Sequence, residues 1–183
     1  MILLPFQRPA QDPIVAGLYG TIVAQARSPI FYRGYGVPDT VGGRFDMIVL
    51  HLVLFLHRLR AESGAVQSLG QEVFNRFCRD MDDNFREMGV GDLSVPKEMR
   101  KVGEAFYGRT AAYEAALAID DNASLVAALN RNIFGASALG ARRLAAYMRE
   151  AVAQLECQQE FSIAVLRFPN PEIIATGELE ENV

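Results

Sequence analysis

The chain has 183 residues, of which half are hydrophobic and 22% are charged, with a formal net charge of −4 and no tryptophan. This length suffices for one domain with a sizeable hydrophobic core. Residues 1–63 carry six basic and four acidic side chains, an excess too small to indicate specific nucleic-acid recognition. Cys78 and Cys157 stand alone, without the spacing of a zinc site or a disulfide framework, as is common in a reducing compartment.

Alanine and leucine are plentiful and β-branched residues rarely run together, which predicts an all-α fold. We expect a single-domain bundle of six to seven helices around a central apolar helix at about 41–62. Capping residues, prolines and glycines mark the helix ends. In chain order, the expected helices are 13–27, 30–35, 41–62, 68–88, 96–119, 124–134 and 137–157, with a further short helix at 159–166.

The central helix has the most distinctive pattern. Phe45, Val49, Leu52, Leu56 and Leu59 recur at spacings of 4, 3, 4 and 3 residues, which is one stripe of an α-helix. Its other faces are also apolar, so other helices should pack on it from both sides. The longest apolar run has ten residues, against about 20 needed to cross a bilayer, so we expect no transmembrane segment.

The two ends of the chain differ in character. Residues 1–11 look irregular and lack the pattern of a signal peptide. We therefore expect a cytoplasmic protein, and docking on a membrane surface is compatible with the sequence. Prolines and glutamates accumulate after residue 168. We therefore expect a helical domain at 1–168 and a mobile acidic tail at 169–183.

Motifs for catalysis, cofactors and metals are not found in the sequence. His51 and His57 are six residues apart, so they cannot share a metal on one helix face as an i,i+4 pair could. There is no Glu-x-x-His, no Gly-x-Ser-x-Gly and no phosphate-binding loop. We therefore predict no catalytic residue, no metal ligand and no cofactor.

Several polar residues fall on apolar helix faces. Arg109 lies on the stripe Met99–Val102–Phe106–Tyr113, so its guanidinium should be paired in the core. Asp80 is the first-ranked partner, followed by Asp46 and by Asp92 or main-chain carbonyls of the 89–92 loop. Two glycines in the same helix, Gly103 and Gly108, suggest a close backbone approach or a bend.

A family resemblance rests on motifs spread over residues 18–150. They are IVAQAR (22–27), GVPDT (36–40), GRFDM (43–47), REMGVGDLSVPKEM (86–99) and AFYGR (105–109). Together they resemble the ubiquinol–cytochrome c chaperone family in its compact bacterial form. The resemblance implies a non-enzymatic assembly factor that binds cytochrome b, or another assembly component of the respiratory bc complex. The mitochondrial members work near the ribosomal exit tunnel, so the ribosome and the inner-membrane surface are further expected partners.

The family has no established catalytic residues to carry over, but it implies candidate client-binding positions, to which Met88 is added as an adaptable apolar side chain. They are Phe31, Tyr32, Asp39, Arg44, Asp46, His51, Arg86, Glu87, Met88, Asp92, Lys97, Tyr107 and Arg109. Of these, Phe31, Tyr32, Met88 and Tyr107 could form an adaptable apolar surface for a client segment. Two alternatives remain: a helical protein that binds haem (ligated by His51), quinone or lipid, and an enzyme with Asp46, His51, Asp80 and Arg109 around a cavity.

Overall fold

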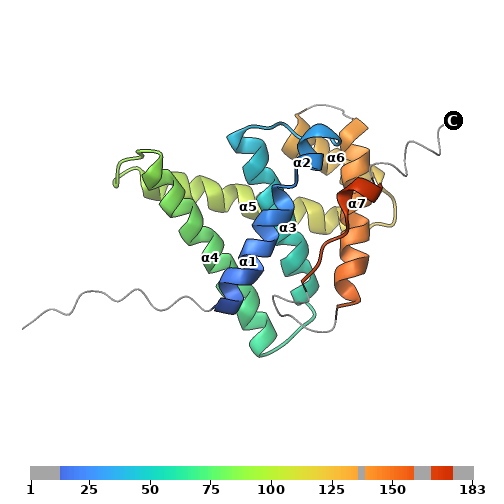
Figure 1. Cartoon of the computed structure of the whole chain (residues 1–183), viewed down its shortest axis with the longest axis horizontal. Coiled ribbons are helices and arrows are strands. Elements are labelled where there is room, and N and C mark those ends of the chain that lie inside the picture. Colours follow the sequence, from blue (N-terminus) through green and yellow to red (C-terminus); the bar gives the residue numbers. More distant parts are fainter. Residues whose placement is uncertain (1–12, 136–138, 159–165, 175–183) are drawn as a thin grey trace, which may run out of the picture.

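Seven α-helices and one π-helical turn form the regular structure of the computed structural model, which describes residues 13–135, 139–158 and 166–174 (Figure 1). The elements are α1 (Pro13–Ala26), α2 (Pro29–Arg33), α3 (Val41–Leu59), α4 (Ala65–Glu87), α5 (Val95–Leu117), α6 (Ala123–Leu129), η1 (Asn130–Phe134) and α7 (Leu139–Glu156). None of the described residues is in a strand. The expected all-α fold is confirmed, with helix boundaries close to those expected.

Helix α3 is the centre of the bundle. It contacts α1, α4, α5, α7 and η1, and Figure 1 shows α4 and the start of α5 on one side of it and α7 on the other. Every residue from Asp46 to Phe55 is buried, because neighbours pack on all its faces as the apolar pattern predicts. Among the described residues, no helix combines the length and apolar character needed to cross a membrane.

The start of α3 is fixed by its cap and by a glycine. The Thr40 hydroxyl accepts a hydrogen bond from the Gly43 N–H at 3.1 Å, which satisfies one of the free donors of the first turn. A Cβ at Gly43 would lie 2.0 Å from the Pro38 carbonyl oxygen. The loop before α3 therefore runs directly against the helix backbone, which only glycine permits here.

Helices α4 and α5 pack through aromatic rings. Phe74 and Phe106 lie 4.7 Å apart between centroids, and Phe77 lies 6.1 Å from Phe106 and 6.3 Å from Phe45 of α3. Phe77 and Phe106 are buried, as the stripes predict. The expectation of a close backbone approach at Gly103 and Gly108 is wrong, because a Cβ there would meet nothing within 4 Å.

Residues 166–174, here called the C-terminal strap, cross the bundle on the side of α1, α2 and α7. The Gln25 amide donates to the Pro169 carbonyl at 3.0 Å, and the Tyr35 hydroxyl donates to the Pro171 carbonyl at 2.8 Å. Leu166 is buried and Phe168 packs on the core. The strap begins near the domain boundary predicted at 168; the boundary itself stays a prediction, and residues 175–183 lie outside the described residues. The irregular segment 1–11, and 159–165 of the expected short helix, also lie outside them.

Candidate functional site

A groove of about 490 Å³ opens where the start of α3, the end of α4 and the start of α5 meet. Each helix contributes side chains at i, i+4 and i+7, the spacing of one helix face. The three sets are Val41, Phe45 and Ile48 on α3; Met81 and Phe85 on α4 with its C-cap residue Met88; and Glu98, Val102 and Ala105 on α5. The groove is thus a three-sided trough with mainly apolar walls.

The groove is open at its mouth. Val41 and Met88 are 76% and 59% exposed, whereas Phe45, Met81 and Phe85 are half-buried behind them. Exposed apolar side chains that continue into a hollow are typical of surfaces that bind another chain. Methionine suits such walls because its unbranched, polarizable side chain adapts to different partners.

The groove has more basic than acidic side chains in its lining. Arg27, Arg44 and Lys101 line it, against one carboxylate, Glu98. Arg44 pairs with Asp39 at 2.7 Å, and Lys101 pairs with Glu98 at 2.9 Å. The Asp39 carboxyl has a lowered pKa because it accepts the Arg44 hydrogen bond.

A second, smaller pocket of about 240 Å³ adjoins the groove at Arg27 and Arg44. We call it the arginine pocket; its lining residues are Arg27, Pro29, Tyr32, Arg33, Asp39 and Arg44. Arg27 and Arg44 line both cavities, so the two are contiguous. The arginine pocket carries three guanidinium groups and one carboxylate.

Behind the groove, Arg109 of α5 pairs with Asp46 of α3. The guanidinium Nη2 lies 2.6 Å from the Asp46 Oδ1, and the two side chains are only 18% and 11% exposed. Arg109 also donates to the Ala105 carbonyl at 3.3 Å and lies over the ring of Phe45 at 5.7 Å. Burial raises the pKa of Asp46, and the nearby Arg109 charge opposes that rise. The pair ties two walls of the groove together.

The ranking of partners for Arg109 was therefore wrong. Asp80 accepts a hydrogen bond from the Tyr19 hydroxyl at 2.8 Å, and Arg76 lies over the Tyr19 ring at 6.0 Å. Burial and the Asp80 bond raise the pKa of Tyr19. Asp80 thus joins α4 to α1, and Asp46 is the carboxylate that pairs with Arg109.

His51 lies in a separate aromatic cluster. It is fully buried, with Phe31 and Phe168 ring centroids at 5.4 and 5.1 Å. Its Nδ1 is 2.8 Å from the Met47 carbonyl, which can only accept, so Nδ1 carries the proton and Nε2 accepts from the Tyr147 hydroxyl at 2.9 Å. Burial lowers the pKa of His51 to about 4. Both ring nitrogens are occupied, so His51 is not available as a haem ligand.

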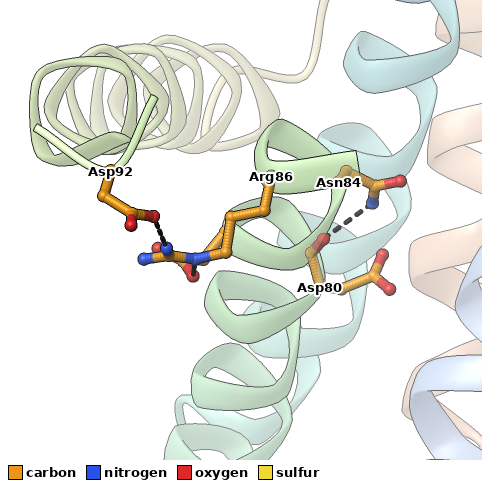
Figure 2. Close-up of polar contacts among 5 residues, drawn as sticks. Asp80, Asn84, Arg86 and Asp92 are labelled. Atoms are coloured by element: carbon orange, nitrogen blue, oxygen red, sulfur yellow. Dashed lines mark hydrogen bonds and ion pairs between the residues drawn. The ribbon is translucent and has the colours of Figure 1, made fainter. Parts of the chain in front are cut away.

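The tip between α4 and α5 is held by an arginine. Figure 2 shows Arg86 reaching from α4 to Asp92 of the loop, and Asn84 donating to the Asp80 carbonyl at 2.7 Å. Arg86 also pairs with Asp82 at 2.7 Å. These contacts shape the end of the α4 wall, although Arg86 and Asp92 do not line the groove.

The candidate residues therefore fall into five groups. Arg44 and Met88 line the groove, and Tyr32 and Asp39 line the arginine pocket. Asp46 and Arg109 lie behind the groove. Arg86, Glu87, Asp92, Lys97 and Tyr107 are exposed outside both cavities. Phe31 and His51 are in the core; Phe31 therefore contradicts the expectation that it belongs to an exposed apolar surface.

Sequence reasoning missed most of the groove walls. Arg27, Ile48, Phe85 and Lys101 were not among the candidates, yet all four line the groove. The available signal was the repeated i, i+4, i+7 spacing near the ends of three consecutive long helices. Within the described part of the chain, no cluster of His, Cys, Asp and Glu is suited to a metal ion.

Comparisons with known proteins agree on one family. The model of the family described as ubiquinol-cytochrome C chaperone matches residues 33–170. Ubiquinol-cytochrome-c reductase complex assembly factor 1 of Xenopus laevis is 26% identical over 129 residues, which are 69% of this chain and 64% of that protein. The human protein of that name is 25% identical over 142 residues, covering 76% of this chain and 47% of that protein.

A solved structure matches most of the fold. The crystal structure of the Cbp3 homolog from Brucella abortus superposes with a TM-score of 0.81 and 38% identity, and the match covers 88% of this chain and 92% of that chain. The chain spans less than two thirds of the length of the curated relatives.

Proposed function

The chain belongs to the ubiquinol–cytochrome c chaperone family, and from this premise we propose that it is a non-enzymatic assembly chaperone that binds cytochrome b during biogenesis of the bc complex. Cytochrome b is the proposed client because it is a multispanning apolar protein whose segments need shielding until haem and partner subunits arrive. Another subunit or assembly component of the complex is the second candidate client.

The groove is the observation that carries this proposal. A chaperone for apolar segments needs an exposed, adaptable apolar surface on a rigid support. The groove provides methionine and phenylalanine walls with Val41 and Met88 exposed at the mouth, and it is supported from behind by the Asp46–Arg109 pair.

The alternative functions receive less support from the geometry. An enzyme would need Asp46, His51, Asp80 and Arg109 around one cavity, but only Asp46 and Arg109 lie together. Haem binding through His51 would require a free ring nitrogen, and both are already in hydrogen bonds.

The proposal is tested in a strain that lacks the gene and is complemented by variants. Val41→Glu with Met88→Glu places charges in the groove mouth without touching the core. We expect assembled bc complex and the reduced haem b spectrum to fall, while the melting temperature of the purified variant stays unchanged. Leu93→Glu, which alters a 98% exposed residue outside the groove, is the matched control. It should leave the assembled bc complex and the reduced haem b spectrum at the wild-type level.

Direct contact is tested with a photocrosslinking amino acid in place of Met88. A crosslink to cytochrome b is the expected product, and the same group at position 93 should give much less. Normal amounts of bc complex in the strain without the gene would overturn the proposal; a crosslink from position 88 only to another subunit of the complex would replace cytochrome b by that subunit.

A further inference from the structure

We propose that the segment held in the groove is a short amphipathic helix with acidic side chains at one end, where they pair with the arginine pocket. This inference rests on the proposed function and adds the chemistry of the client segment. Its basis is the contiguity of an open apolar trough with a pocket of three arginines.

The spacing of the groove walls indicates a helical occupant. Each wall presents side chains at i, i+4 and i+7, so each runs for about 10 Å along its helix at 1.5 Å per residue. That length matches two turns of an incoming helix, whose own anchors recur at the same spacing.

The open mouth indicates that the occupant keeps one face in water. Sites for small molecules usually bury about 70–90% of the ligand surface, whereas Val41 and Met88 of the groove mouth are themselves largely exposed. An amphipathic helix fits this shape, because its apolar face enters the trough and its polar face stays solvated.

The charges indicate what lies at the end of that helix. Arg27 and Arg33 are exposed, and no described residue forms an ion pair or hydrogen bond with either side chain. The third guanidinium, of Arg44, is already paired with Asp39. Two arginines that no described residue pairs with, in a pocket beside an apolar groove, favour a segment that supplies carboxylates and disfavour one that ends in lysines.

The test uses the full chain and three fluorescent peptides that share one amphipathic helix of about four turns and end in three glutamates, three glutamines or three lysines. At low salt, the glutamate peptide should bind about threefold to tenfold more tightly than the glutamine peptide, the range for a few exposed ion pairs. The lysine peptide should bind most weakly, and the differences should shrink as salt rises.

Charge reversal in the protein is the decisive part of the peptide-binding experiment. The double variant Arg27→Glu with Arg33→Glu should invert the order, so that the lysine peptide binds best. Arg79→Glu with Arg131→Glu changes the net charge equally at exposed positions outside both cavities, and it should keep the wild-type order. Melting temperatures of both variants show that each is folded.

Several outcomes would overturn the inference. Equal binding of the three peptides would do so, as would an unchanged order in the Arg27→Glu, Arg33→Glu variant. Binding to phosphatidylglycerol vesicles that is lost in the same variant, without any preference among peptides, would assign the site to a lipid surface instead.

The experiments can contradict the inference without contradicting the proposed function, and the reverse. If groove variants reduce the bc complex but the peptides show no preference for end charge, only the inference is wrong. If the peptides show the preference but loss of the gene leaves the bc complex at its normal level, the proposed function is wrong while the binding chemistry holds.

Discussion

Arg109 and Asp46 form a mostly buried pair whose loss should be costly. Arg109→Ala removes the partner of a carboxylate that is 11% exposed, and stranding a buried charge costs about 3–5 kcal/mol. Arg109→Lys should recover only part of this, because an ammonium group does not reproduce the planar guanidinium. Urea unfolding measures both losses.

The matched control for this pair lies at the surface. Arg44→Ala breaks a pair whose side chains are 58% and 57% exposed, and such pairs contribute about 1 kcal/mol or less. Equal losses in Arg44→Ala and Arg109→Ala would contradict the assignment of Arg109 to a buried pair.

His51 should make the folded state sensitive to mild acid. Its pKa is lowered from 6.5 to about 4 because it is buried. Below pH 6.5 the His51 ring is protonated in the unfolded chain but stays neutral in the folded protein. The free energy of unfolding is therefore highest above pH 6.5 and falls as the pH drops toward 4. The expected loss is about 3 kcal/mol.

Unfolding free energies between pH 7 and pH 4 measure this effect. His51→Gln has no titrating ring, so its stability should vary less over the same range, even if its stability at pH 7 is lower. Parallel curves for the two proteins would show that another group causes the pH dependence.

At the scale of the elements, replacing two glycines by alanine should change stability in opposite directions. Gly43→Ala places a Cβ 2.0 Å from the Pro38 carbonyl oxygen, so the loop before α3 must shift, at a cost of about 1–3 kcal/mol. Gly103→Ala meets nothing within 4 Å inside α5 and should stabilise by about 0.4–1 kcal/mol. Thermal unfolding of both variants tests the placement of α3 and α5, and a stable Gly43→Ala would contradict the close contact at the start of α3.

The elements could be predicted because their signals are local. The stripe from Phe45 to Leu59 marks α3, and the prolines at positions 13, 29 and 96 mark the first turns of three helices. Polar pairs between helices depend on tertiary packing, which local sequence signals do not show. Asp80 was ranked first for Arg109 by its place on α4, but Tyr19, 61 residues away, occupies it.

The candidate site was only partly predictable for the same reason. Arg44 was identified through the family resemblance and Met88 as an adaptable apolar side chain. The groove itself exists because the ends of three helices meet in a particular register. Phe31 looked like a surface aromatic in its short motif, yet the packing of Tyr35, His51 and Tyr147 around it places it in the core.

At the scale of the whole molecule, the C-terminal strap should act as part of the fold. A chain that stops after Gln158 loses Leu166, Phe168 and the carbonyls that accept from Gln25 and Tyr35. We expect the free energy of unfolding to fall by about 2–5 kcal/mol, the contribution of burying one or two large apolar side chains. A chain that stops after Ile174 keeps the strap and is the control; equal melting temperatures for the two chains would show that the strap contributes nothing.

The groove lies where three helices end or begin, and this position bears on how quickly it can change shape. Terminal turns open with much smaller free energies than the middle of a helix, because their hydrogen bonds are incomplete and exposed. Amide hydrogen exchange should therefore be fast at 41–44 and 85–88 and slow at 47–55, where α3 is buried throughout. A client could then be admitted and released by brief fraying of the rim, while the centre of the bundle remains closed.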